Sequence, residues 1–500
     1  MKKNSIVYGT VSGILFQFLS IIFAFLLRTV MISKLGNEYI GLITVYSSIA
    51  GLLTSLDGGM ASSVFIKIHK PLADNDENEI KRVYNLIRII YFIRAALMFI
   101  FSFFIIFFLP KLTKEVSFEY SLVYITFLLY MIMSSVNVYV IYKKFMLEAL
   151  QIRYISNVVS IKYMVLFYVL NIIQLFIFRN FLLYIVLSLC IDGFSSIKCN
   201  KYIVEKYPYL GKKKLDFKQV DLRELFDMSK IMLHTLSDVV VRNSDNLIVS
   251  NITNIKIVGM FSNYRMIIIN LENVVLQFLL SIKDPLRNRM AVTNDMQDMK
   301  EIHNVFTYLC FVIANVTCVG IVVTINDLIG NLWLSDKFVL PVAPIFFMVS
   351  SIFLHLVTFP IIDAYFFNEC YMDDTRTPIF EIFINIVVSI ILGKMIGLAG
   401  VFIGTFIYQI YRVTKRSYVY YRDTYKETNV RFLINVLAYF VIYILCIFIS
   451  LRIFTLLNID NVFILFISKV LLTIAVCAIM STLLCVRKIR VLVELMKKRK

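Results

Sequence analysis

An apolar stretch from 226 to 250, long enough to cross a bilayer, carries five ionisable residues at helical spacing. They are Lys230, His234, Asp238, Arg242 and Asp245, and steps of three or four residues place them on one helix face. A charge at the bilayer centre costs about 3 kcal/mol on insertion scales, so this face must meet water or charged partners inside the protein. Such a stripe can bind an anion, carry protons or hold a helix bundle together through ion pairs.

Ionisable residues also fall inside other apolar segments of the chain. They are Arg28, Asp57, Arg94, Lys162, Asp192, Arg265, Glu272 and Asp363. Two interpretations stay open: the charges line a solvated transport pathway, or they pair with one another inside a helix bundle. Their number favours the pathway, because structural pairing alone seldom needs so many.

The composition determines the class of protein that can hold these residues. Of 500 residues, 59% are hydrophobic and 17% are charged, which leaves too little polar surface to coat a soluble globule. The chain divides into about fourteen apolar segments of roughly 20 to 28 residues, each able to span a hydrocarbon core of roughly 30 Å. We therefore predict an all-α polytopic membrane protein with about 14 transmembrane helices, including segments near 83–109 and 397–417. Two of the breaks between segments are predicted at Arg179 and at Gly393 to Gly397.

The positions of Lys and Arg predict the orientation in the membrane. If the N-terminus is cytoplasmic, the inner loops and tail hold most of the basic residues, including Lys212 to Lys214, the group Arg412, Lys415 and Arg416, and the tail from Arg487 to Lys500. This imbalance predicts a multi-pass protein with both termini in the cytoplasm. The net charge of +18 then reflects orientation and attraction to anionic lipid, and nucleic acid is not expected as a partner.

Signs of enzyme chemistry are missing from the sequence. The four His residues are too scattered in sequence to suggest a metal cluster, and neither a Walker-type loop nor a nucleophile elbow occurs. The outer loops are too short to hold a catalytic domain. We therefore predict no enzyme activity, no catalytic residues, no metal and no cofactor, apart from coupling to H⁺ or Na⁺.

An internal repeat is visible when the chain is aligned with itself. The shift that sets Gly41 over Gly259, here called the repeat offset, also sets Tyr46 over Tyr264. Because the repeat offset spans six segments, both copies enter the membrane in the same direction and form a parallel repeat. We predict two pseudo-symmetric six-helix lobes plus two C-terminal helices. The predicted domains are a lobe over 1–200, a basic cytoplasmic linker over 201–225, a second lobe over 226–420, two additional helices over 428–488 and a basic cytoplasmic tail over 489–500.

Two stretches of the sequence carry recognisable motifs. One is His69 to Arg88, HKPLADNDENEIKRVYNLIR, preceded by Leu56-Asp57-Gly58-Gly59. The other runs from 243 to 267 and contains Asp245-Asn246, Val258-Gly259 and Ser262-Asn263-Tyr264. Both stretches resemble Wzx-type polysaccharide flippases, which belong to the multidrug, oligosaccharidyl-lipid and polysaccharide exporter superfamily. The resemblance implies two six-helix lobes, sometimes followed by two extra helices, which agrees with the repeat.

The resemblance also implies a function. It points to translocation of undecaprenyl-diphosphate-linked oligosaccharide repeat units by alternating access, in the bacterial cytoplasmic membrane, for capsule or O-antigen-type polysaccharide synthesis. The expected partners are the polyprenyl-diphosphate-linked glycan, membrane lipids, and glycan polymerases and glycosyltransferases of the same pathway. A cation-coupled drug or small-molecule antiporter of the same superfamily is the first alternative, and a membrane glycan polymerase or ligase is the second.

A diphosphate needs fixed cations, which Arg side chains supply through paired hydrogen bonds. The expected substrate-binding residues are Arg28, Arg94, Arg242 and Arg265. The carboxylates Asp57, Asp238, Asp245 and Glu272 have two open roles, as partners of these arginines or as proton or sodium sites that drive exchange.

Overall fold

The structure is a computed structural model that describes residues 3–54, 68–74, 76–150, 152–210, 229–292 and 296–484. Over these ranges the chain is helical, with turns and short connections and no strand. Fourteen of the described helices are long, and the shortest of these is α2 (Asn37–Thr54) with 18 residues. The predicted all-α polytopic fold class is confirmed.

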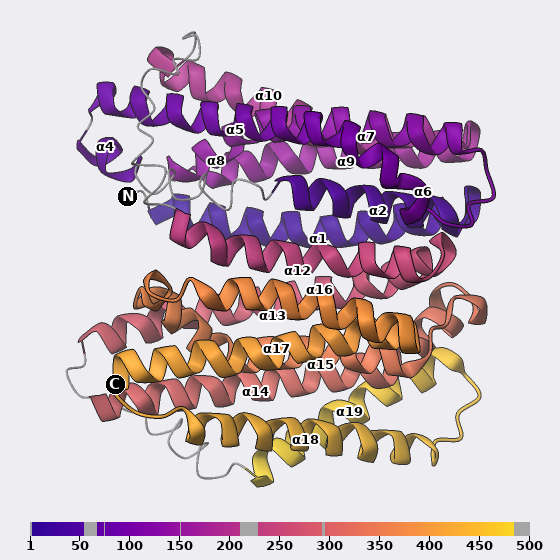
Figure 1. Cartoon of the computed structure of the whole chain (residues 1–500), viewed down its shortest axis with the longest axis vertical. Coiled ribbons are helices and arrows are strands. Elements are labelled where there is room, and N and C mark those ends of the chain that lie inside the picture. Colours follow the sequence, from indigo (N-terminus) through magenta and orange to yellow (C-terminus); the bar gives the residue numbers. More distant parts are fainter. Residues whose placement is uncertain are drawn as a thin grey trace. The chain divides into compact units, whose positions relative to one another are not determined.

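The long helices follow the predicted segments in order (Figure 1). In the first half they are α1 (Lys3–Lys34), α2, α5 (Glu77–Ile105), α7 (Tyr120–Val140), α9 (Arg153–Ile177) and α10 (Phe181–Lys206). In the second half they are α12 (Ser229–Ile252), α13 (Ile255–Val292), α14 (Met296–Asp327), α15 (Val342–Phe367), α16 (Arg376–Ile396), α17 (Leu398–Tyr420), α18 (Val430–Phe454) and α19 (Val462–Leu484).

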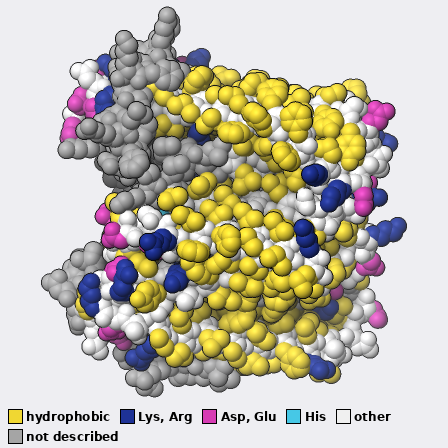
Figure 2. All heavy atoms as spheres, viewed as in Figure 1, with side chains coloured by type: hydrophobic (Ala, Val, Ile, Leu, Met, Phe, Trp, Pro, Cys, Tyr) yellow, Lys and Arg dark blue, Asp and Glu magenta, His cyan; other side chains and the backbone are white. Residues whose placement is uncertain are grey.

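Among the described helices, eleven are long and apolar enough to cross a membrane. The other three long helices are α2, α12 and α17. The described part of α2 has only 18 residues, and α12 carries the charged stripe. Figure 2 shows the corresponding surface pattern, with hydrophobic side chains over the middle of the helices and most charged side chains in view near the helix ends. That pattern suits a hydrocarbon core flanked by water.

The repeat seen in the sequence recurs in the helix boundaries. Helix α1 ends at Lys34 and α2 begins at Asn37, while α12 ends at Ile252 and α13 begins at Ile255. Both boundaries differ between the copies by the repeat offset. The first six long helices therefore correspond in order to α12 through α17, and α18 and α19 follow as an additional pair.

The predicted breaks at Arg179 and at Gly393 to Gly397 are confirmed, and they occupy equivalent places in the repeat. Arg179, between α9 and α10, has φ +48°, and Gly397, between α16 and α17, has φ +66°. The repeat offset sets one of these residues over the other. A left-handed residue cannot continue a helix, and glycine adopts that region without the penalty that a Cβ imposes. The chain therefore turns at the same point of each repeat.

Contacts divide the chain into two compact units, Met1–Gly259 and Met260–Lys500, here called unit 1 and unit 2. In unit 1, α9 packs against α1 and α10, α7 against α5 and α10, and α12 against α2. In unit 2, α17 packs against α15 and α16, and α14 against α15 and α19. The division falls inside α13, so these units of contact differ from the predicted domains, whose bounds stay a prediction.

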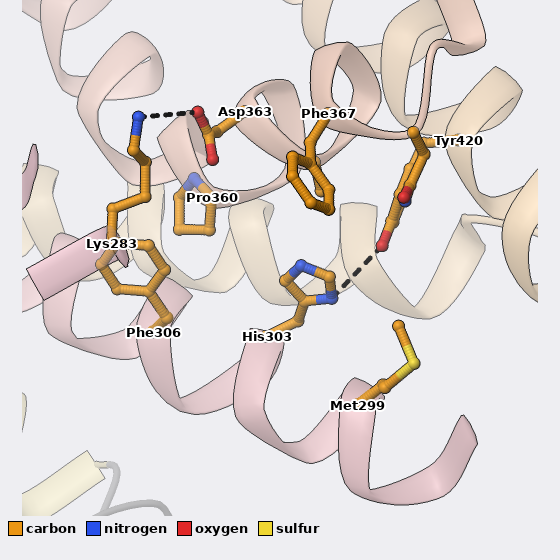
Figure 3. Close-up of a pocket in the computed structure, with 10 residues that line it drawn as sticks. Lys283, Met299, His303, Phe306, Pro360, Asp363, Phe367 and Tyr420 are labelled. Carbon is orange, nitrogen blue, oxygen red and sulfur yellow. Dashed lines mark hydrogen bonds and ion pairs between the residues drawn. The ribbon is translucent and has the colours of Figure 1, made fainter. Parts of the chain in front are cut away.

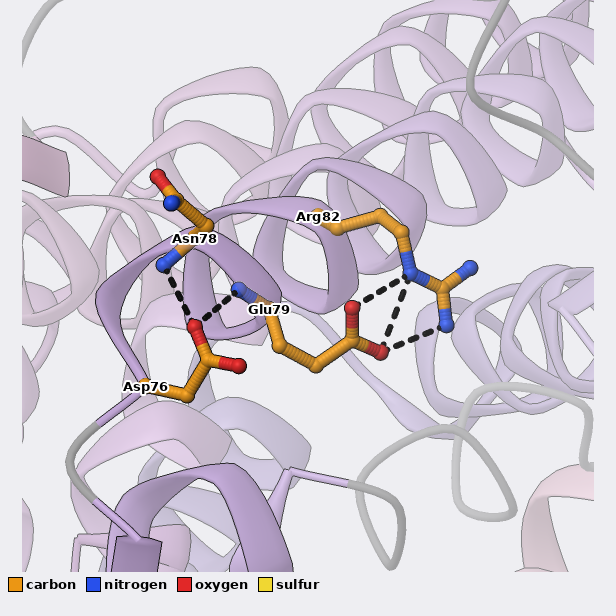
Figure 4. Close-up of polar contacts among 4 residues, drawn as sticks. All are labelled: Asp76, Asn78, Glu79 and Arg82. Atoms are coloured by element: carbon orange, nitrogen blue, oxygen red, sulfur yellow. Dashed lines mark hydrogen bonds and ion pairs between the residues drawn. The ribbon is translucent and has the colours of Figure 1, made fainter.

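Helix α5 begins at Glu77, earlier than the expected start near residue 83. The reason is a side-chain cap, which Figure 4 shows: one carboxylate oxygen of Asp76 accepts hydrogen bonds from the backbone N–H groups of Asn78 at 3.0 Å and Glu79 at 3.1 Å. Glu79 in turn forms an ion pair with Arg82 at 2.7 Å. The cap satisfies N–H groups at the helix start, and so the helix extends beyond its apolar part.

Candidate functional site

The charged stripe on α12 has a packed edge and an open edge. His234 and Asp245 are buried, Asp238 is half-buried, and Arg242 is exposed. The side chain of Lys230 lies outside the described residues. Helix packing therefore does not enclose the whole stripe, because Arg242 reaches the surface of the described structure.

Polar contacts hold α12 against α2 within unit 1. The amide of Asn246, next to Asp245, donates a hydrogen bond to the Ser48 hydroxyl at 2.7 Å. About one turn along, a Cβ on Gly51 would meet the end of the Asn243 side chain, which would have to shift. Asn246 thus helps to hold the charged face of α12 in place against α2.

The beginnings of α2 and α13 cross through a reciprocal glycine contact. A Cβ on Gly41 would collide with the Ile255 carbonyl, and a Cβ on Gly259 would collide with the Asn37 carbonyl. Asn37 and Ile255 are themselves equivalent at the repeat offset, so each copy of the repeat presents its glycine to the first residue of the other copy's helix. The Asn37 amide also donates to the Lys256 carbonyl at 2.7 Å. The Val258-Gly259 motif therefore has a packing role.

Arg28 and Arg94, two of the predicted substrate-binding residues, are half-buried on α1 and α5 of unit 1. Arg94 donates a hydrogen bond to the Thr54 carbonyl, and its guanidinium lies 5.0 Å from the centroid of the Tyr91 ring. Arg28 lies within electrostatic reach of the Tyr184 hydroxyl on α10. Both guanidiniums are thus held among helices inside apolar segments.

Glu272 and Arg265 both lie on α13, and the structure pairs Glu272 with a partner that sequence reasoning missed. The Glu272 carboxylate is 5% exposed and lies 2.8 Å from Nδ1 of His355 on α15. Arg265 is half-buried about two turns before Glu272. Asp57 lies outside the described residues. No local pattern could have revealed His355, which is far from Glu272 in the sequence.

Unit 2 contains two further ion pairs whose partners could not be matched from the sequence. Arg416, assigned above to an inner loop, lies in α17 and is fully buried. It donates two hydrogen bonds to Glu381 of α16, at 2.8 and 2.7 Å. Asp363 pairs with Lys283 at 3.4 Å. The loop assignment of Arg416, which overlapped the predicted segment near 397–417, was wrong because Arg416 lies inside α17. These pairs show that part of the charge within the apolar segments is structural.

These side chains can do two kinds of chemistry. Guanidiniums held in apolar helices can bind oxyanions, and the 2.8 Å contact between Glu272 and His355 can hold a proton between a carboxylate and an imidazole. The described residues contain no group of three or more His, Cys, Asp or Glu that could hold a metal ion.

Comparisons with solved structures show which proteins share this fold. An inward-closed structure of the lipid II flippase MurJ matches with a TM-score of 0.63 at 16% identity, over 96% of this chain and 98% of that one. An inward-facing multidrug resistance MATE family transporter of the MOP superfamily matches with a TM-score of 0.58 at 13% identity, over 78% of this chain and 92% of that one. An outward-facing MATE transporter reaches 0.52 at 13% identity, over 83% and 94%.

The chain has the fold of these flippases and transporters. At these identities the match shows the fold and leaves the substrate open. No family model matches the sequence, and no curated protein sequence matches it.

Proposed function

We propose that the protein is a flippase that moves polyprenyl-diphosphate-linked oligosaccharides across the bacterial cytoplasmic membrane by alternating access. The proposal needs no covalent chemistry from the protein. Among its expected partners are the glycosyltransferases that build the glycan and the polymerase that consumes it. Wzx-type flippases remain the family that the sequence motifs resemble.

The extent of the fold match carries this proposal. The lipid II flippase MurJ aligns with 96% of the chain, which leaves no room to omit α18 and α19. The inward-facing MATE transporter aligns with 78% of the chain. The larger share of the chain that the flippase covers supports a flippase of lipid-linked substrates over a drug transporter.

The arginines supply chemistry that suits such a substrate. A diphosphate head group must enter a membrane region where its charge needs compensation, and Arg offers a planar fork for two phosphate oxygens. Arg242 is the strongest candidate, because it is exposed on α12 while its neighbours Val241 and Ser244 are buried. Arg28, Arg94 and Arg265 stay proposed contacts of the same substrate.

Transport into proteoliposomes tests the proposal directly. A fluorescent polyprenyl-diphosphate oligosaccharide is reconstituted with wild-type protein, Arg242→Ala or Arg242→Lys, and accessibility to a membrane-impermeant quencher reports flipping. We expect Arg242→Ala to lose most of the transport at equal protein content, and Arg242→Lys to recover part of it, because lysine keeps the charge and loses the fork. Arg452→Ala, at an exposed arginine in the last turn of α18, is the matched control. Wild-type transport by Arg242→Ala would contradict the proposal.

The Glu272–His355 pair favours a second candidate, a cation-coupled antiporter of small molecules. A buried carboxylate beside an imidazole can take up and release a proton as the helices move. In the same vesicles under an imposed pH gradient, an antiporter would exchange labelled organic cations for protons and Glu272→Gln would stop it. Gradient-driven cation exchange without movement of the lipid-linked glycan would decide for this alternative.

A further inference from the structure

A cavity of about 150 Å³ lies inside unit 2, apart from the residues assigned to substrate binding. It lies where the end of α15 meets the first turns of α14, with Lys283 of α13 and Tyr420 of α17 at its wall. Under the predicted topology this end of the helices is cytoplasmic. Figure 3 shows the side chains around it.

Most of the cavity wall is apolar. Met299, Phe306, Pro360, Ala364 and Phe367 form this surface. The wall also includes the ion pair between Lys283 and Asp363, whose side chains are each 16% exposed. A mostly apolar wall with a few polar groups is typical of small-molecule sites, and this volume suits one ring or a short chain.

His303 provides the polar group that determines the chemistry of the cavity. Its side chain is buried, and its Nδ1 lies 2.7 Å from the hydroxyl of Tyr425, in the turn that follows α17. The Tyr420 hydroxyl lies 3.4 Å from Nδ1 and 3.4 Å from the Tyr425 hydroxyl, so two hydroxyl donors face this nitrogen and we assign Nδ1 as the acceptor. A neutral imidazole that accepts at Nδ1 carries its proton on Nε2.

That proton has no acceptor among the described residues, because Nε2 is buried without a hydrogen-bond partner. In Figure 3 the ring nitrogen away from Tyr420 faces the space beside Pro360 and Phe367. A buried N–H without an acceptor is costly, and a ligand oxygen in the cavity would remove that cost.

We infer that this cavity is a binding site for a small, mostly apolar molecule that carries one hydrogen-bond-accepting oxygen. The oxygen accepts the Nε2 proton of His303, and the apolar body packs against Phe306 and Phe367. The site is independent of the proposed flippase substrate, whose head group is far too large for about 150 Å³.

Two fluorinated probes of similar size test the role of the oxygen. Purified full-length protein in detergent is titrated with 4-fluoroacetophenone, which has an acceptor, or with 1-ethyl-4-fluorobenzene, which has none, and ¹⁹F NMR line broadening reports binding. We expect about ten-fold tighter binding of the ketone, the effect of roughly one hydrogen bond.

Three variants locate the binding. Ala364→Leu fills the cavity and should abolish binding of both probes, which also defines the background from the micelle. Ala343→Leu, an exposed position on the same helix, should bind like wild type. His303→Phe keeps a ring and removes the donor, so the preference for the ketone should disappear.

Each contrary result overturns the inference. If the two probes bind with equal affinity, the ligand oxygen has no role in binding. If the preference for the ketone survives in His303→Phe, His303 is not the donor to that oxygen. Binding that Ala364→Leu does not reduce lies elsewhere. If wild-type protein shows no binding above the Ala364→Leu background, the cavity holds water only.

Discussion

Each repeat has one end that the predicted topology places on the cytoplasmic side, and this end is built from different side chains in the two units. In unit 1 this end is an apolar core that includes Tyr84, Leu147 and Ile203. In unit 2 the corresponding end holds the buried Arg416–Glu381 pair, the Lys283–Asp363 pair and the cavity beside His303. The order of the long helices and the turns at Arg179 and Gly397 agree between the copies, so the repeat preserves the path of the backbone while the interior diverges.

One pair of equivalent positions makes this divergence concrete. At the repeat offset, Arg416 and Glu381 correspond to Lys198 and Tyr163. Lys198 is exposed, and the Tyr163 ring stacks on Phe194 with centroids 6.2 Å apart. An aromatic contact in unit 1 therefore replaces a buried ion pair in unit 2, and the two units should respond differently to equivalent substitutions.

The largest difference is expected for Arg416→Ala compared with Lys198→Ala. Removing Arg416 leaves Glu381 buried at 0% exposure without its cation, which should cost about 3 to 5 kcal/mol and lower the yield of folded protein. Lys198→Ala should change stability by less than about 0.5 kcal/mol, because the side chain is exposed. Thermal unfolding in detergent, followed by far-ultraviolet circular dichroism, measures both variants.

A paired replacement separates loss of the ion pair from loss of volume. Arg416→Met with Glu381→Leu removes both charges and keeps apolar bulk, so it should recover most of the stability lost in Arg416→Ala. If Arg416→Ala unfolds at the same temperature as Lys198→Ala, the proposed contrast between the two units is wrong.

The next effect concerns a contact in which the two copies act alike. Gly41→Ala and Gly259→Ala each place a Cβ against a backbone carbonyl, which cannot rotate away, and each should cost about 1 to 3 kcal/mol. The two variants should lower the unfolding temperature by similar amounts. Gly320→Ala is the matched control, because a Cβ there meets nothing within 4 Å and the helix gains about 0.5 to 1 kcal/mol. Stability of Gly41→Ala equal to that of Gly320→Ala would refute the reciprocal contact.

Sequence reasoning captured the features that depend on local composition and spacing. Apolar length predicted the long helices, and the repeat offset paired Gly41 with Gly259, which the structure brings into one crossing. It missed the cap at Asp76, because hydropathy marks only the apolar part of a helix and does not extend to a polar first turn. It missed the Glu272–His355 pair, because packing between distant helices brings these residues together. Counting basic residues also put Arg416 in a loop, since a count carries no information on partners.

The smallest effect distinguishes two tyrosines that hold equivalent places in the repeat. Tyr46 donates to the Val123 carbonyl at 2.9 Å, near the start of α7, and Tyr264 accepts from the Leu340 backbone N–H at 2.9 Å, just before α15. Tyr264 also donates to Asn326 at 2.7 Å. Each hydroxyl therefore ties the second helix of its repeat to the beginning of the fourth.

Tyr264→Phe should be the more costly of the two hydroxyl deletions. It leaves the N–H of Leu340, a buried residue outside any helix, without its acceptor, which should cost about 1 to 3 kcal/mol. Tyr46→Phe frees a carbonyl inside α7, where helical bonding continues, and should cost about 1 kcal/mol. Unfolding temperatures measured side by side in the same detergent give the order. If Tyr46→Phe lowers the unfolding temperature more than Tyr264→Phe does, the expected order is wrong, and the Tyr46 hydroxyl stabilises unit 1 by more than its hydrogen bonds indicate.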